Sequence, residues 1–197
     1  MKFSVADLLD QLSIDQSVSL ATLAKILKLS NKTDKAGLDL ASVALAKIGV
    51  LEILENGELQ RLQNEDLIDA RLRCSSKGFC FALRDDGGDD IYIRDHQLNH
   101  AWNGDRVLVR VTREGGRRRS PEGGVQCILE RATRSLLAQV MRQDDQLMAS
   151  PLDDRMLATI QLSEEAAEHL PTDPPTAVVE VAVDRYPLAQ YPAQGRV

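Results

Sequence analysis

Between Asp69 and Glu130 the chain alternates short apolar runs with clusters of Gly, Asp and Asn, and this pattern limits the fold more than any other feature. Short alternating runs are typical of half-buried strands, and Gly, Asp and Asn are the residues that tight turns need. Five short strands with one longer connection after the third indicate a small Greek-key barrel, the OB-fold. The predicted strands are Arg71–Cys74, Gly78–Leu83, Asp90–Ile93, Arg106–Val111 and Gly124–Glu130.

The segment before this barrel has apolar residues at helical spacing, followed by a short hairpin. Ser4 and Ser19 are suitable N-caps for the first two helices. A third helix is predicted from about Ala36 to Ile48, after a polar turn that covers 31–35. Asn56-Gly57 lies between two runs that contain apolar residues, which is the strongest short signal for a hairpin. Three helices and a hairpin predict a winged helix-turn-helix.

The last part of the chain predicts a second barrel of the same kind. Strand-like runs cover 136–142, 146–150, 156–162 and 176–185, and a fifth strand begins at Gly195. We expect this barrel to lack its last strand and the chain to be truncated, because an incomplete barrel leaves an exposed edge. The predicted fold is an α+β multidomain chain. Its domains are a winged helix-turn-helix at 1–66, a first OB domain at 67–134 and a second, truncated OB domain at 135–197.

Charge is distributed unevenly over these domains. The chain has a net charge of −6, but residues 71–134 carry +4 while the segments before and after carry −4 and −6. Of the 13 basic residues in the middle segment, 12 are Arg, the residue that binds phosphate bidentately and stacks on bases. This balance excludes a protein that coats nucleic acid through a uniformly basic surface, whereas a local cationic patch remains possible. Chance clustering on a solvated surface is the alternative.

The candidate binding residues lie in the predicted second and third strands of the first barrel. Because side chains alternate along a strand, Lys77, Phe79 and Phe81 share one face. Pairing with the next strand can place Tyr92 beside the two Phe rings, as a platform for stacked bases. Alternatively, the rings face the barrel interior or a neighbouring domain. Further candidates are Arg84, Arg94 and Arg106, with Arg117, Arg118 and Arg119 as a phosphate clamp or a solvated loop tip.

These residues resemble a known family. Lys77-Gly78-Phe79-Cys80-Phe81 and Asp90-Ile91-Tyr92-Ile93 look like the two RNA-binding motifs of cold-shock domains. The wider run KGFCFALRDDGGDDIYIRDHQLNHAWNGDRVLVRV resembles the first cold-shock domain of the RNase II/RNase R exoribonucleases. A helix-turn-helix before paired cold-shock domains is similar to the RNase R branch. Departures are Cys80 for the usual Gly, Ala82 for a β-branched residue and Arg94 for a frequent His.

The resemblance implies a 3′-to-5′ exoribonuclease that works in RNA degradation. In that family such domains gather single-stranded RNA and feed its 3′ end to a catalytic centre. There, clustered Asp residues hold magnesium in a large nuclease domain downstream. We therefore expect no catalytic residue, metal site or cofactor in this chain, with single-stranded RNA and the downstream nuclease domain as its partners.

Other site chemistries are less well supported. The acidic run Asp85–Asp90 fits a turn better than a cation site, and His96 and His100 lack a full set of zinc ligands. The three cysteines are odd in number and contain no CxxC pair, which argues against a disulfide framework or a zinc finger and favours a reducing compartment, the cytoplasm. No membrane span or signal peptide is predicted.

Two alternative functions remain: a DNA-binding regulator led by residues 1–65, and a protein-interaction module that contacts a partner through the acidic outer domains.

Overall fold

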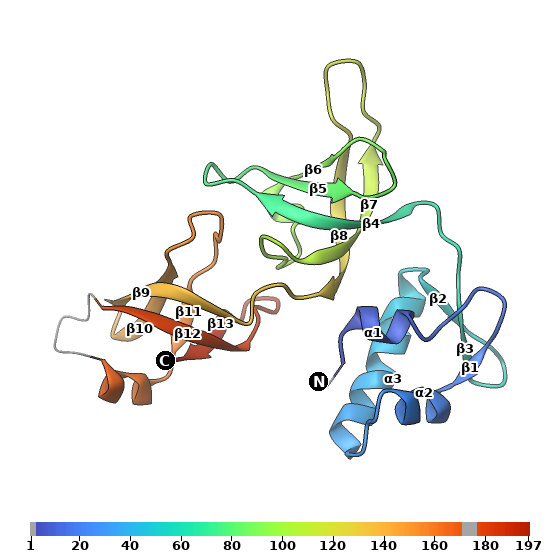
Figure 1. Ribbon diagram of the computed structural model, residues 1–197, viewed down its shortest axis with the longest axis horizontal. Helices are drawn as coiled ribbons and strands as arrows, with labels where there is room; N and C mark the ends of the chain where they lie inside the picture. The colour runs from blue at the N-terminus through green and yellow to red at the C-terminus, as the bar shows by residue number, and fades with distance from the viewer. Residues whose placement is uncertain (1–2, 171–176) are drawn as a thin grey trace.

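The computed structural model describes residues 3–170 and 177–197 and shows three folded units that follow one another along the chain (Figure 1). The first unit combines helices with a small sheet, and the other two are closed barrels. No helix within the described ranges is long and apolar enough to cross a membrane. The first unit contains α1 (Val5–Leu9), β1 (Val18–Ser19), α2 (Leu20–Ile26), α3 (Lys32–Lys47), β2 (Leu51–Ile53) and β3 (Glu58–Arg61).

Side-chain caps explain where the helices of the first unit begin. The Ser4 and Ser19 hydroxyls cap α1 and α2, as predicted, each by accepting a hydrogen bond from a backbone N–H three residues further on. α3 begins at Lys32, four residues before the predicted start. The reason is that the Asn31 side-chain oxygen accepts a hydrogen bond from the Asp34 N–H at 2.7 Å. The predicted turn before this helix is therefore wrong.

The predicted hairpin is present and forms two strands of a three-stranded sheet. β2 and β3 pair antiparallel around Asn56-Gly57, and Gly57 has a φ of +79°, which a residue without a Cβ adopts easily. The two-residue β1, which the sequence pattern did not predict, pairs with the other edge of β3. Leucines from all three helices and the hairpin fill the core between them. They are Leu8, Leu23, Leu38, Leu45, Leu51 and Leu59.

The first barrel confirms the predicted five strands with somewhat different ends. Its strand order is β4-β5-β6-β8-β7, and β7 returns to pair with β4, so the sheet closes. β6 and β8 are the parallel pair, as the longer connection between them allows. The elements are β4 (Leu67–Cys74), β5 (Cys80–Arg84), β6 (Ile91–Ile93), the 3₁₀ helix η1 (Asp95–Gln97), β7 (Arg106–Arg113) and β8 (Glu122–Glu130).

The second barrel repeats this topology. Its strand order is β10-β11-β13-β12-β9, and β11 and β13 are the parallel pair. The expectation that its last strand is missing is wrong, because the four-residue β13 pairs with both β11 and β12 and closes the barrel. Thr176, included in the predicted fourth strand, lies outside the described residues. The elements are β9 (Ser135–Gln143), β10 (Gln146–Pro151), β11 (Ile160–Leu162), the 3₁₀ helix η2 (Glu164–His169), β12 (Val178–Arg185) and β13 (Ala193–Arg196).

A disulfide joins β4 to β5 in the first barrel. Cys74 and Cys80 are direct partners in the antiparallel register, so their side chains meet on the buried side of the sheet and bond to each other. This single disulfide removes the support that the cysteines gave to a reducing compartment, because strand pairing brings two thiols together without a CxxC spacing. Cys127 is the free cysteine.

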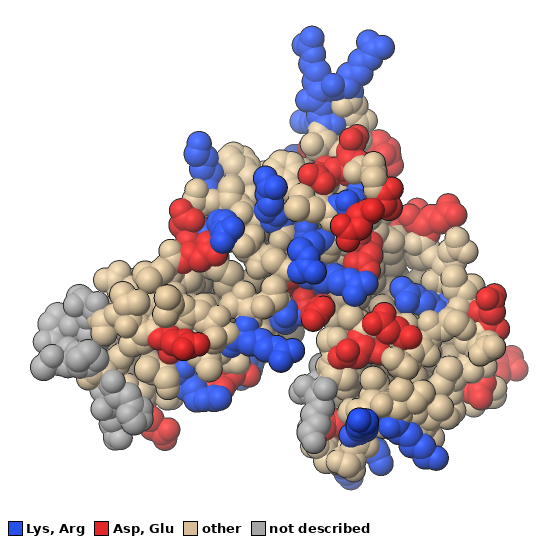
Figure 2. Space-filling view, viewed as in Figure 1, with Lys and Arg blue, Asp and Glu red and all other residues tan. Residues whose placement is uncertain are grey.

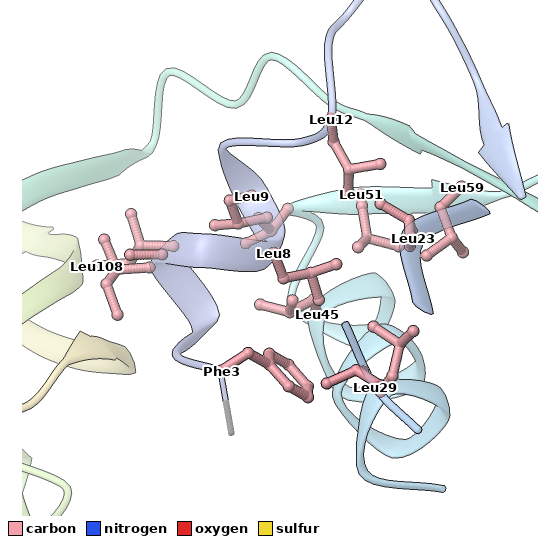
Figure 3. Close-up of a cluster of buried hydrophobic side chains, with 14 residues drawn as sticks. Phe3, Leu8, Leu9, Leu12, Leu23, Leu29, Leu45, Leu51, Leu59 and Leu108 are labelled. Carbon is pink, nitrogen blue, oxygen red and sulfur yellow. The ribbon is translucent and has the colours of Figure 1, made fainter. Parts of the chain in front are cut away.

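The first unit packs against the outside of the first barrel. Val107 and Val109 of β7 fill the barrel, so the intervening Leu108 points outward. Leu108 and Leu129 join the leucine core of the first unit, and Figure 3 shows Leu108 beside α1. A guanidinium nitrogen of Arg110 also donates to the Ile48 carbonyl at 3.3 Å.

An ion pair and two aromatic rings connect the two barrels. The fully buried Asp105 accepts hydrogen bonds from the N–H groups of Trp102 and Ala132 and from Arg131, at 2.8, 2.9 and 3.0 Å. The Arg131 guanidinium lies over the Tyr186 ring at 4.2 Å. Trp102, from the first barrel, is buried in the core of the second. This arrangement fixes the short connection between the barrels.

Candidate nucleic-acid interface

Three aromatic rings lie together on the outer face of the first barrel. Cys80, Ala82 and the two isoleucines of β6 point into the barrel and are almost fully buried. Phe81 and Tyr92 therefore point outward, and their ring centroids are 5.4 Å apart. Phe79 is 51% exposed, with its ring 6.5 Å from that of Tyr92. The predicted grouping of the rings is confirmed, and the alternative that they face the interior is wrong.

The turn before β5 holds Phe79 in position. The Ser75 N–H donates to the Phe79 carbonyl at 2.8 Å, and the Phe79 N–H donates to the Ser75 hydroxyl at 3.2 Å. Gly78 has a φ of +79°, which closes this turn. Lys77 is exposed at its tip. The hydrogen bonds and the neighbouring cystine together restrict the backbone that presents Lys77 and Phe79.

Phe81 and Tyr92 belong to a row that crosses every strand of the barrel. Directly paired residues on neighbouring strands point to the same side of a sheet. The register links Phe81 to Tyr92 between β5 and β6, and Tyr92 to Glu122 between β6 and β8. We call this set the outer row. From β4 through β5, β6 and β8 to β7 it is Arg73, Phe81, Tyr92, Glu122 and Arg113.

Three arginines surround the Glu122 carboxylate at one end of the outer row. Arg94 donates from two guanidinium nitrogens to one Glu122 oxygen, at 2.9 and 3.2 Å. Arg113 and Arg119 approach the other oxygen at 3.9 and 3.7 Å. The hydrogen bond from Arg94 is the largest cause that lowers the pKa of Glu122 below its ordinary range. The carboxylate is therefore ionised at neutral pH.

The structure does not bring all predicted arginines to the rings. Arg84 makes a two-point ion pair with Asp86, at 2.8 and 2.6 Å, and this contact lowers the pKa of Asp86 to about 2. Arg106 pairs with Asp69 in the same way, and it begins the strand that Arg113 ends. In the register Arg106 lies beside Arg71 of β4, two residues from Arg73 of the outer row, but its guanidinium is held by Asp69.

The β7–β8 hairpin carries the predicted arginine clamp. Its two strands extend to Arg113 and from Glu122, and a bridge between Gly116 and Arg119 continues the pairing toward the tip. Much of the segment between the predicted fourth and fifth strands, residues 112–123, is therefore a hairpin. Figure 2 shows basic side chains projecting from its end, above an acidic area. Arg117 and Arg118 are exposed there, while Arg119 turns back toward the outer row.

Sequence reasoning missed three members of the outer row. Arg113 and Glu122 lie just outside the predicted strands, which end at Val111 and begin again at Gly124. Arg73 alternates with the buried Leu72 and Cys74, so the strand period alone was enough to predict that it faces outward. The missing signal was the register, which depends on how five strands align and not on any one of them.

The second barrel has the same row with different chemistry. The register between its strands links Met148 to Gln161 and Gln161 to Gln194, in the places of Phe81, Tyr92 and Glu122. The complete row is Met141, Met148, Gln161, Gln194 and Arg185. It contains no aromatic ring and no carboxylate. Two barrels of one topology therefore differ at the surface where bases could stack.

The described residues contain no group of three or more His, Cys, Asp or Glu side chains placed to hold a metal ion. Asp86 of the acidic turn is paired with Arg84. The arrangement on the outer face suits a different chemistry, in which flat rings accept bases and guanidinium groups contact phosphates.

Two successive OB-type barrels, one with an exposed aromatic and cationic row, define a multidomain protein of the oligonucleotide-binding class. Comparison with known families assigns it further. Residues 70–128 match the Ribonuclease B OB domain, and residues 6–62 match the N-terminal domain of cyanobacterial RNase R. The chain belongs to the RNase R family and corresponds to its N-terminal region.

Individual relatives agree with this assignment. The chain is 46% identical over its whole length to the acetazolamide conferring resistance protein zam of Synechocystis, covering 25% of that protein. It is 29% identical to Ribonuclease R of Aquifex aeolicus, over 89% of this chain and 23% of the relative. The chain thus spans about a quarter of the length of these curated relatives.

Solved structures share the fold. The yeast pseudonuclease Ssd1 matches with a TM-score of 0.54 and 18% identity, over 66% of this chain and 22% of Ssd1. RNase R of Mycoplasma genitalium, solved in complex with ribose-methylated single-stranded RNA, matches with a TM-score of 0.52 and 18% identity. This match covers 66% of this chain and 21% of that enzyme.

Proposed function

We propose that this chain is the single-stranded RNA-binding module of an RNase R-like 3′-to-5′ exoribonuclease, acting in RNA degradation in the cytoplasm. The observation that carries the proposal is the ring cluster of Phe79, Phe81 and Tyr92, which is held on an exposed barrel face beside arginines. Exposed rings on a small barrel are suited to stack on bases without sequence preference.

In this proposal the first barrel provides most of the affinity for RNA. The rings accept bases, while Lys77, Arg73 and Arg94 contact the phosphates on either side. The second barrel guides RNA without stacking, since Met148 and Gln161 replace the central rings. Arg84 and Arg106 have a lesser role, because each already makes a two-point ion pair with a carboxylate, Asp86 and Asp69 respectively.

A filter-binding titration with a single-stranded oligonucleotide tests the proposal. Replacing both rings, Phe79→Ala with Phe81→Ala, removes two stacking surfaces worth roughly 1–3 kcal/mol each, so affinity is expected to fall at least 30-fold. The matched control is Met148→Ala in the second barrel, which alters the equivalent position without removing a ring and is expected to leave affinity nearly unchanged.

An unchanged affinity in the double ring variant would refute stacking as the basis of binding.

We further propose that the chain binds RNA without cutting it, since magnesium and the hydrolytic residues belong to the nuclease domain that the family implies. Incubation of the purified chain with magnesium and labelled RNA is expected to leave the RNA intact.

For the first unit we propose a winged helix-turn-helix that contacts a protein partner. Its three helices and β2–β3 hairpin have the order of that fold. The hairpin carries Glu52, Glu55 and Glu58, which would repel a nucleic-acid backbone. A role in duplex DNA binding would instead require loss of binding on charge reversal at Lys32 and Lys35.

A further inference from the structure

Glu122 has an unusual place in a surface built to contact RNA. It is a member of the outer row, next to Tyr92 on the neighbouring strand, and its side chain is only 12% exposed. The side chains of Arg94, Arg113 and Arg119 that surround it are 49%, 57% and 58% exposed. The acid therefore lies beneath three basic groups, and the basic groups reach solvent.

The charges in this cluster do not balance. One carboxylate faces three guanidinium groups, which leaves a local excess of two positive charges beside the Tyr92 ring. Arg94 binds Glu122 closely, whereas Arg113 and Arg119 are at 3.9 and 3.7 Å, beyond hydrogen-bond distance. The two outer arginines keep donors that a second anion can use.

We infer that Arg94, Arg113 and Arg119 form a phosphodiester subsite and that Glu122 sets its affinity by competing with RNA phosphate for the same arginines. The inference rests on the proposed function and assigns a role to a residue of the same surface. Without RNA, Glu122 holds the arginines beside the rings. When RNA binds, a phosphate takes over part of their hydrogen bonding while the neighbouring base stacks on Tyr92.

The second barrel shows that an amide is tolerated at the position of Glu122. Gln194 occupies the equivalent place in β13, between Gln161 and Arg185. Arg185 lies over the Tyr191 ring at 5.8 Å, and in the described part of the chain it makes no ion pair. Glu122→Gln therefore introduces a side chain that this topology already accommodates, and the variant is expected to fold.

The test compares Glu122→Gln with the unaltered chain in binding to polyuridylate and to inorganic polyphosphate. Ion pairs whose arginines reach solvent change affinity modestly, so the variant is expected to bind polyuridylate about three- to fivefold more tightly. Its salt dependence is expected to steepen by about 0.7 in the log–log slope for each additional phosphate contact. Polyphosphate has no bases, so it reports on the subsite without the rings.

Glu130→Gln is the matched control. It removes the same charge from the same strand, eight residues and roughly 26 Å further along β8. This control is expected to bind both ligands like the unaltered chain. Adding Arg94→Gln to Glu122→Gln is expected to abolish the gain, because the freed arginine is then absent.

The outcomes separate this inference from the proposed function. Equal or weaker binding of both ligands by folded Glu122→Gln, verified by its circular dichroism, would overturn the competition and make Glu122 an organiser of the arginines. An equal gain in Glu130→Gln would reduce the effect to net charge and would also overturn it. If the ring variant leaves RNA binding unchanged while Glu122→Gln still gains affinity for polyphosphate, the stacking proposal fails and the subsite stands.

Discussion

The Cys127 thiol is partly buried where β8 packs against the core of the first unit. Burial raises its pKa from an ordinary 9.0 to about 11, so the thiol is protonated throughout the neutral range. Because only the thiolate is a good nucleophile, native protein at pH 8 is expected to react with Ellman's reagent far more slowly than unfolded protein. A Cys127→Ser variant supplies the blank.

The same shift has a consequence for stability. The folded state holds the Cys127 proton more tightly than the unfolded chain does. The contribution of this proton to the free energy of unfolding is therefore complete below pH 9 and is lost as the pH rises toward 11. Rapid labelling of the native thiol at pH 8 would contradict this burial and the packing of the first unit on β8.

At the scale of single residues, the side of the sheet to which a side chain points was the most predictable property. Once Ile91 and Ile93 are assigned to the core, the two-residue period of a strand sends Tyr92 outward. Partners were much less predictable. The ion pairs of Arg84, Arg94 and Arg106 each depend on an acid brought close by a turn or a neighbouring strand, and no local pattern states which acid that is.

Gly123 and Gly195 are equivalent positions in the last strands of the two barrels. A Cβ on Gly123 would lie 2.7 Å from the Arg110 carbonyl oxygen, and one on Gly195 would lie 2.6 Å from that of Ala182. Backbone cannot move aside as a flexible side chain can. Either Gly→Ala change is therefore expected to lower the free energy of unfolding by about 1–3 kcal/mol, measured by urea denaturation.

Gly116 provides the comparison for these substitutions. It lies in the β7–β8 hairpin, and an added Cβ there meets no atom within 4 Å. Gly116→Ala is expected to change the unfolding free energy by less than about 0.5 kcal/mol. If all three alanine variants unfold alike, close backbone packing is not what requires glycine in the last strands.

The elements themselves followed from the sequence with errors at their ends. The positions of the five strands of the first barrel along the chain were predictable, because alternating runs and turns are local signals. Their lengths were not, as shown by β7 and β8, whose pairing continues to Arg113 and Glu122 inside a polar segment. Cross-strand hydrogen bonds extend a hairpin whatever its local polarity, and β13 is short for a strand yet closes its barrel.

The whole molecule depends on a charged contact between its barrels. Asp105 is fully buried, and Arg131 packs against both barrels through Trp102 and Tyr186. Asp105→Asn keeps the shape of the side chain but leaves Arg131 without its counter-charge. We expect a loss of about 3 kcal/mol in unfolding free energy, the usual cost of an unpaired charge in a partly buried place.

Asp153→Asn breaks an exposed ion pair with Arg155 and serves as the control, with an expected change under about 1 kcal/mol. Thermal and urea unfolding of both variants would measure the difference. Equal effects would mean that the connection between the barrels is held by the rings alone. This contact was beyond prediction from sequence, since Asp105, Arg131 and Tyr186 come from separate segments.

The bond between Cys74 and Cys80 makes the covalent structure of the ring-bearing turn depend on the buffer. Reduction of this buried bond would leave that turn restrained by its hydrogen bonds. Titrations with and without a reductant therefore compare two chemical species. Any difference in their affinities for RNA measures how far the cystine preorganises Phe79.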